Sequence, residues 1–271
     1  MKTLLCAVSH GLYSPWLEIL KNGQEKTWLN DPIPKNLEVL HFHGTPVGTF
    51  LQALDRAHEK IRWSNRHLHR AQALVDNFFL FPWSGYIPRS EVSELLIAKP
   101  KTIHIRFPDT YLTYRWKFLG LIKYFIEQTS HDFLFTTTTA SYINLQVLSG
   151  KVKELNSESL YYGGKAYDGA EFISGAHRII SRDVAFRILS MKRLWPAGTI
   201  EDVALGKLLA KSGIEPSFIP LNNISTLEEL ELKTDEFLNG NYHFRLKAGP
   251  SSQRRDSEIM KALHTRLRGI V

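Results

Sequence analysis

Glu201 and Asp202 are adjacent carboxylates that the sequence places in the first turn of a predicted helix. Pro196 and Gly198 interrupt the chain just before them, Thr199 is a predicted cap, and apolar residues follow at helical spacing. Acidic residues near the positive end of a helix dipole stabilise the helix by about 0.3–1 kcal/mol each, so capping alone accounts for the pair. A positioned carboxylate can also accept a proton from a reacting hydroxyl group. Both interpretations stay open from these two residues alone.

A second group with chemical potential lies late in the chain. In a strand over residues 242–247, His243, Arg245 and Lys247 would project to one side and apolar side chains to the other. Cationic groups on one face can bind phosphate through charge-assisted hydrogen bonds. An edge strand that carries charge to resist aggregation has the same pattern. The alternation therefore predicts the strand, and leaves phosphate binding as one of two interpretations.

The elements that must position these groups alternate between strand and helix. Apolar and β-branched runs predict strands over residues 3–8, 37–42, 103–107, 133–139, 160–162, 172–180, 218–220 and 242–247. Helical spacing predicts helices over residues 50–81, 111–128, 142–148, 182–191 and 201–211, and a basic terminal helix from residue 251 to about 268. A polar turn is predicted at 150–156. Strands that alternate with helices predict an α/β fold with a mostly parallel central sheet flanked by helices.

Composition limits the class of protein. With 271 residues, of which 43% are hydrophobic, the chain can bury a large core. The single cysteine, Cys6, excludes an intrachain disulfide, and no run approaches the ~20 apolar residues of a membrane span, so we expect a cytoplasmic protein. A formal charge of +7 favours an anionic partner. Nucleotide diphosphate, nucleic acid, acidic glycan and anionic lipid all fit that charge.

Six segments from Asp109 onward also match a known order of motifs. They are residues 109–113 with Lys117, residues 133–135, residues 142–145, Ser174-Gly175 with Ser181, residues 201–206 and residues 212–216. In this order they resemble the D-S-Y-x-N-L-T-x-K segment, the strand and helix around the metal motif, S-G-G-G-Y-x-x-S, E-D-V-x-x-G and L-G-I-x-P of one enzyme family. That family is the beta-1,3-galactosyltransferases and beta-1,3-N-acetylglucosaminyltransferases, with the Fringe-like enzymes included.

The resemblance implies a fold and a reaction. The fold would be a single nucleotide-sugar-binding domain of the GT-A type over residues 1–271. A nucleotide-sugar lobe would span residues 1–150, and an acceptor and catalytic lobe with the basic terminal helix would span residues 151–271. The reaction would be inverting transfer of a sugar, from a UDP-sugar in the first instance, to a hydroxyl acceptor on a glycan or lipid-linked glycan. Asp202 would be the catalytic base and Glu201 its neighbour.

One departure from the family concerns the metal. The family's D-x-D is replaced by Thr138-Thr139-Ala140, and no carboxylate occurs between Asp132 and Glu154. We therefore expect no metal ligands and no cofactor, with cationic side chains on the diphosphate instead. The residues expected to bind the donor are Ser9, His10, Thr27, Lys117, Thr138, Thr139, Ser174, Gly175, His243, Arg245 and Lys247.

Two other functions compete with this one. Arg62, Arg66 and Arg70 stand four residues apart in a predicted helix and could follow a phosphate backbone, which favours a viral glycosyltransferase that modifies hydroxylated bases in DNA. A solvated helix face has the same appearance. The loss of D-x-D favours a sugar- or nucleotide-binding module without catalysis. Binding to DNA with a steep salt dependence would identify the DNA-modifying glycosyltransferase, and absence of donor hydrolysis would identify the non-catalytic binding module.

Overall fold

A computed structural model of the chain shows the arrangement of most residues. It describes residues 1–12, 14–46, 92–95, 101–109, 114–155, 161–165, 172–196, 200–219, 222–249 and 254–269. The predicted helix over 50–81, with Arg62, Arg66 and Arg70, lies outside these residues, as does most of the 109–113 segment.

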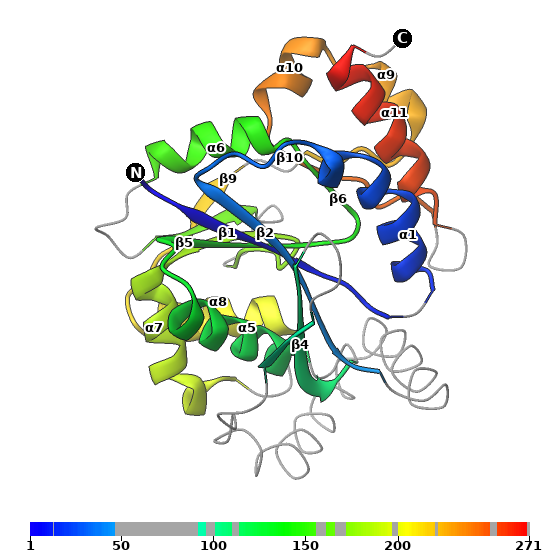
Figure 1. Cartoon of the computed structure of the whole chain (residues 1–271). Helices are drawn as coiled ribbons and strands as arrows, with labels where there is room; N and C mark the ends of the chain where they lie inside the picture. Colours follow the sequence, from blue (N-terminus) through cyan, green and yellow to red (C-terminus); the bar gives the residue numbers. More distant parts are fainter. Residues whose placement is uncertain are drawn as a thin grey trace, which may run out of the picture.

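A central sheet organises the described residues (Figure 1). Eight strands form it in the order β3-β4-β2-β1-β5-β8-β7-β9. Their bounds are β1 Leu4–Ser9, β2 Leu37–Thr45, β3 Val92–Leu95, β4 Lys101–Pro108, β5 Phe133–Thr138, β7 Tyr162–Lys165, β8 His177–Ser181 and β9 Ser217–Ile219. The strands β4, β2, β1 and β5 run parallel, whereas β3 and β8 run antiparallel to their neighbours. A separate pair, β6 (Ser141–Ile143) with β10 (His243–Arg245), is antiparallel.

Helices cover both faces of this sheet (Figure 1). One face carries α5 (Tyr114–Gln128), α7 (Arg182–Ser190) and α8 (Glu201–Ala210). The other carries α1 (Trp16–Asn22), α6 (Leu145–Glu154), α9 (Leu227–Glu231), α10 (Asp235–Gly240) and α11 (Asp256–Arg268). Short 3-10 helices span Gln24–Lys26, Trp28–Asn30 and Lys192–Leu194. The predicted fold class, an α/β protein with a mostly parallel sheet between helices, is confirmed. None of the described helices is long and apolar enough to cross a membrane.

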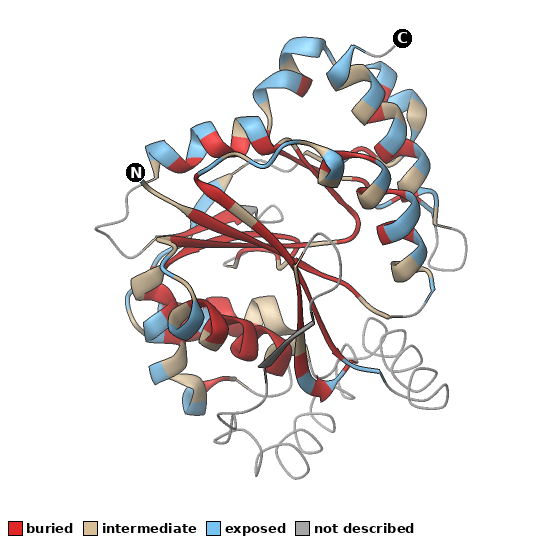
Figure 2. Cartoon of the chain, viewed as in Figure 1, coloured by how far each residue is buried: buried red, intermediate tan, exposed pale blue. Residues whose placement is uncertain are grey.

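Strand β1 lies near the middle of the sheet and shows how the core is divided. Its Leu5 and Ala7 belong to the apolar cluster under α5, α7 and α8, and its Leu4, Cys6 and Val8 to the cluster on the opposite face. All these residues are buried. Most of β1 has the colour of buried residues in Figure 2. Burial also raises the pKa of the Cys6 thiol. A strand that is covered on both faces has apolar residues at successive positions. Such a run can be recognised in the sequence, which is why β1 was predicted.

Three local predictions are wrong. The segment predicted as a helix over 142–148 begins as β6, and only then does Asn144 start α6 by accepting a hydrogen bond on Oδ1 from the Val147 N–H at 3.4 Å. That helix continues through Gly150 to Glu154, where a polar turn was expected. The strand predicted over 172–180 begins only at His177, because Gly175 and its neighbours form a turn.

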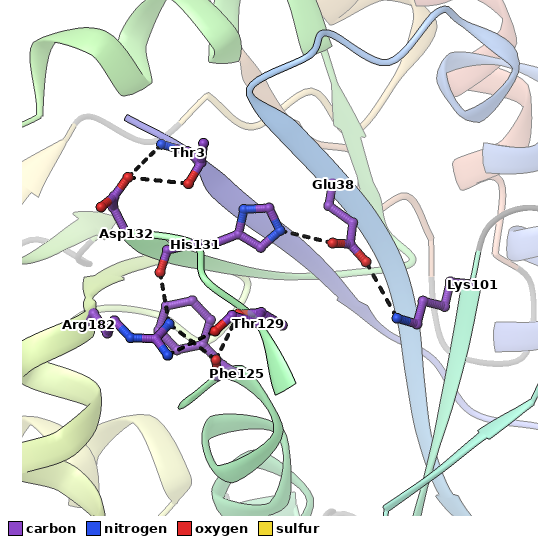
Figure 3. Close-up of polar contacts among 8 residues, drawn as sticks. All are labelled: Thr3, Glu38, Lys101, Phe125, Thr129, His131, Asp132 and Arg182. Carbon is purple, nitrogen blue, oxygen red and sulfur yellow. Dashed lines mark hydrogen bonds and ion pairs between the residues drawn. The ribbon is translucent and has the colours of Figure 1, made fainter. Parts of the chain in front are cut away.

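A polar cluster joins the elements at the edge of the sheet where β1 begins (Figure 3). Arg182 donates from Nη1 and Nη2 to the backbone carbonyls of four residues between 125 and 131, at the end of α5. His131 Nε2 lies 2.9 Å from Glu38 Oε2, and this hydrogen bond is the main cause that lowers the pKa of Glu38. Asp132 accepts from the Thr3 N–H at 2.8 Å. These contacts tie α5, α7 and the starts of β1, β2 and β5 together.

Candidate functional site

Glu201 and Asp202 are the first two residues of α8, as predicted. Ile200 precedes them at the N-cap, where no side chain provides a capping hydrogen bond. The Asp202 carboxylate accepts from the Val203 N–H at 2.9 Å, and the backbone N–H of Gly175 lies near enough to lower the pKa of that carboxyl. A Cβ on Gly175 would lie 3.4 Å from Glu201 Oε2. The Ser174-Gly175 turn and the carboxylate pair, which are far apart in sequence, therefore meet.

A buried arginine lies beneath these carboxylates. Arg178 has no exposed surface, and its Nη1 is 2.9 Å from Glu201 Oε1, an ion-pair distance at which the N–H is not aimed well enough for a hydrogen bond. Its guanidinium carbon stacks 3.8 Å from the centre of the Phe118 ring in α5. The sequence patterns predicted no role for Arg178. A charged residue directly before Ile179-Ile180, in a segment predicted as a strand, is the signal that could have identified it.

The environment raises the pKa of both carboxylates. Burial is the main cause for Glu201, whose pKa is raised to about 7 by burial and by Asp202 and lowered by Arg178. Burial likewise raises the pKa of Asp202, against the effects of Arg178 and the backbone N–H groups. A group that titrates near neutral pH can both accept and release a proton there. The carboxylate pair therefore has the electrostatic properties of a general base.

The end of β1 lies close to the same cluster. Ser9, the last residue of β1, lies near Tyr114 at the start of α5, and the charges of Glu201 and Arg178 act on the pKa of the Tyr114 phenol. Burial is the main cause that raises the pKa of Tyr114. In the register of the sheet Ser9 stands beside Thr138 of β5. Ser9, Thr138 and the carboxylates thus lie around the carboxyl ends of the two central parallel strands.

A group of histidines lies on the opposite face of β8. The rings of His177 and His243 are 4.4 Å apart between centroids, and His243 Nε2 lies 3.0 Å from Ser141 Oγ. Because consecutive strand residues point to opposite faces, His177 faces this group while Arg178 faces α5. Between the two groups runs the turn of residues 174–177, in which Ala176 accepts a hydrogen bond on its carbonyl from Thr137 Oγ1 at 2.9 Å.

The predicted cationic strand is shorter than expected, and the exposure of its three cationic residues increases along the chain. His243 is buried, Arg245 is half-buried, and Lys247 is exposed and lies beyond the end of β10. Arg245 pairs with Ser141, and the next N–H, of Leu246, donates to the Ala140 carbonyl at 2.7 Å. This pairing places β10 beside the Thr138-Thr139-Ala140 segment. Thr138 is half-buried and Thr139 is buried.

A third cluster consists of histidines from β2, from β4 and from the residue that follows β1. The ring of His10 lies 5.3 Å from that of His41 and 5.1 Å from that of His43, and His43 stacks on His104 at 5.1 Å. Burial is the main cause that lowers the pKa of His10 to about 4 and that of His41 to about 3. Both rings are therefore neutral at physiological pH. Of these histidines only His10 was predicted from the sequence to belong to the site. The available signal for His41 and His43 was their alternate spacing in a mostly apolar strand.

The buried His41 ring is expected to lower the stability of the folded protein at acidic pH. Its Nε2 is buried without a hydrogen-bond partner, so we expect His41→Phe to fold normally at pH 7. The pKa of His41 is about 3 in the folded protein against 6.5 for an ordinary histidine, so the unfolded chain binds the extra proton and stability is lost as pH falls below 6.5. At pH 5 the variant should gain about 1–2 kcal/mol relative to wild type, measured by urea unfolding at both pH values. An equal pH dependence in the two proteins would contradict this.

Other predicted donor residues are held in local contacts. Thr27 is buried and its hydroxyl donates to the Gly23 carbonyl at 2.8 Å. Lys117 forms a buried ion pair with Asp109, near His10. Ser174 Oγ accepts from the Ala176 N–H at 3.3 Å. Among the residues that the structure describes, no three His, Cys, Asp or Glu side chains are grouped so that they could hold a metal ion.

Comparison with known proteins gives a distant structural likeness. No protein family matches the sequence, and no curated protein matches it. Among solved structures, the chain is similar to the glycosyltransferase GlyE of Streptococcus pneumoniae TIGR4, with a TM-score of 0.45 and 7% sequence identity over 99% of this chain and 63% of that one. The apo form of GlyE gives a TM-score of 0.42 and 8% identity, with 99% and 62% covered. The chain thus spans less than two thirds of the structures it matches.

Proposed function

We propose that this protein is an inverting glycosyltransferase of the GT-A type. It would transfer a sugar from a nucleotide-diphosphate donor, a UDP-sugar first among the candidates, to a hydroxyl group of a glycan or lipid-linked glycan. The observation that carries the proposal is the meeting of Asp202 with the Gly175 turn, beside the carboxyl ends of β1 and β5. In open α/β sheets ligands bind outside the carboxyl ends of the parallel strands. The motif order from Asp109 to Pro216 supports the same assignment.

The proposed reaction needs one base. The Asp202 carboxylate accepts the proton of the acceptor hydroxyl as the acceptor oxygen attacks the anomeric carbon of the sugar. The bond between that carbon and the phosphate oxygen breaks, and its electron pair leaves with the nucleoside diphosphate. Attack from the side opposite the leaving group inverts the anomeric configuration, so no covalent sugar–enzyme intermediate forms.

The leaving diphosphate needs positive charge. We propose that Arg245, with contributions from His243 and Lys247, supplies it without a divalent ion. The support is the pairing of β10 with β6, which puts Arg245 next to the segment that replaces D-x-D. Thr138 and Thr139 would add hydroxyl groups to the same region. A charge-assisted hydrogen bond to phosphate contributes about 1.5–3 kcal/mol, more than a neutral one.

Nucleotide-sugar binding and donor hydrolysis test this function together. A thermal-shift screen of nucleoside diphosphates and their sugars, with and without EDTA, should identify a stabilising donor. Arg245→Ala should weaken its binding by about 10-fold to 150-fold, more for the diphosphate than for the monophosphate. Arg187→Ala, which removes an exposed arginine of α7, should leave binding unchanged.

Three outcomes would contradict the proposal in different ways. Binding without donor hydrolysis or transfer would indicate a sugar- or nucleotide-binding module. Activity that EDTA abolishes and Mn²⁺ restores would show that the diphosphate is held by a metal. Equal donor binding by wild type and Arg245→Ala would show that β10 is not part of the donor site.

A further inference from the structure

Arg178 is held rigidly in the interior by three neighbouring elements. It lies on β8 between Thr136 of β5 and Gly164 of β7. A Cβ on Gly164 would stand 3.1 Å from the Arg178 Cα and 2.1 Å from the His177 carbonyl oxygen, so the strands approach closely here. The Phe118 ring of α5 covers one side of the guanidinium. The guanidinium is thereby directed at the start of α8.

The depth of the three charged groups increases from the carboxylates to the arginine. The Asp202 side chain is partly exposed, the Glu201 side chain is 9% exposed, and the Arg178 side chain is 0% exposed. Arg178 therefore lies behind the carboxylate pair as seen from the surface. Since no part of it reaches solvent, Arg178 does not touch a substrate bound at the carboxylates, and it acts on such a substrate through Glu201, with which it pairs, and through its charge on Asp202.

Charge balance shows what this arrangement does. The cluster contains one guanidinium, two carboxylates and the phenols of Tyr114 and Tyr162, which stay neutral because burial raises their pKa values. With both carboxylates ionised the cluster has one net negative charge, and with one proton it is neutral. Burial favours the neutral state, and the nearby cation opposes protonation. The guanidinium is thus the group that allows both carboxylates to be ionised near neutral pH.

We propose that Arg178 is a positioning residue for the proposed reaction: it pairs with Glu201 from behind and sets the number of protons that Glu201 and Asp202 share. This inference rests on the proposed function, in which Asp202 must be ionised to take the acceptor proton. Glu201 then acts as the link between the buried cation and the base. The two carboxylates titrate as a unit, so their apparent pKa values belong to the pair.

The pH dependence of turnover tests the inference. In Arg178→Met the pair should retain a proton to higher pH, so the acid limb of the kcat profile should move up by about one to two pH units. Turnover should fall by about 10-fold or more at pH 7 and approach the wild-type value at high pH. Arg178→Lys, which keeps the charge, should restore most of the profile. An equal fractional loss at every pH would show that Arg178 is only structural, and would overturn the proposal.

Two control variants separate charge and folding from positioning. Arg187→Met removes an exposed positive charge from α7, and Arg182→Met removes a partly buried set of hydrogen bonds at the start of the same helix. Neither should move the acid limb, although Arg182→Met should lower stability. If either control moved the limb as Arg178→Met does, the effect would not be specific to Arg178.

A measurement without turnover separates this inference from the proposed function. In protein with ¹³C-labelled glutamate carboxyl groups, the signal lost in Glu201→Gln identifies Glu201. Its titration midpoint should rise by at least about one pH unit in Arg178→Met, and an unchanged midpoint would overturn the inference even if the protein transfers sugar. If Arg178→Met does not fold, Glu201→Gln serves in its place: with one carboxylate left beside Arg178, the acid limb should move to lower pH. An acid limb of Glu201→Gln at the same pH as in wild type would contradict the inference that Glu201 and Asp202 share protons.

Discussion

Replacement of Asp202 by asparagine is expected to lower turnover by about 100-fold or more, with little change in donor affinity or stability. The amide has nearly the same shape and its oxygen can still accept from the Val203 N–H, but it cannot take a proton from the acceptor hydroxyl. Initial rates at saturating donor and acceptor, together with a donor binding isotherm, measure both parts of this prediction.

Asp183 provides a matched control for this change. It stands in the first turn of α7 and accepts from the Val184 N–H at 2.7 Å, much as Asp202 accepts from Val203 in α8. Asp183→Asn therefore removes the same kind of helix-terminal carboxylate away from the Gly175 turn, and its turnover should stay near the wild-type value. Near wild-type turnover in Asp202→Asn would mean that Asp202 is not the base, and Glu201 would be the next candidate.

Gly164→Ala should have the largest effect on stability, a loss of about 2–4 kcal/mol. Gly164 has a φ of +146°, which side chains rarely adopt, and a Cβ there would lie 2.1 Å from the His177 carbonyl oxygen. Since that oxygen belongs to the backbone of β8, relief requires the strands β7 and β8 to separate. Urea unfolding monitored by tryptophan fluorescence measures the change.

Gly150→Ala is the control for this substitution. Gly150 lies in the middle of α6, and a Cβ there would have no atom within 4 Å. The same chemical change should therefore stabilise the protein by about 0.5–1 kcal/mol, because alanine is the better helix former. If Gly164→Ala unfolded at the same urea concentration as wild type, the close packing of β7 on β8 described above would be wrong.

The sequence predicts the central elements of this fold well because their pattern is local. The strands β1, β2 and β5 appear as short, mostly apolar runs, and β4 as an alternation of apolar and polar residues; helical or turn segments separate them. The short helices α9 and α10 were not predicted, since five or six residues give too little periodicity. For α9 a capping signal was present: Thr226 accepts from the Glu229 N–H, and Glu229 accepts from the Ser225 N–H.

Only the residues of the candidate site that lie in recognisable motifs could be predicted from the sequence. The motifs predicted Glu201, Asp202 and Gly175 as site residues, and these residues lie next to one another in the structure. Arg178 was not found because its role depends on the register of β8 against β5 and β7, which no local pattern specifies. His41 and His43 were missed for a related reason: their ring contacts join β2 to β1 and β4, which are separate in sequence.

Cys6 lies in the middle of β1 with no exposed surface, and it is the only cysteine in the chain. Maleimides and iodoacetamides react with the thiolate, and burial raises the thiol pKa so that this species is scarce in the folded protein. A cysteine introduced at an exposed position will therefore carry a fluorophore or spin label almost alone. Pairs of such labels can report distances across the sheet without prior replacement of Cys6.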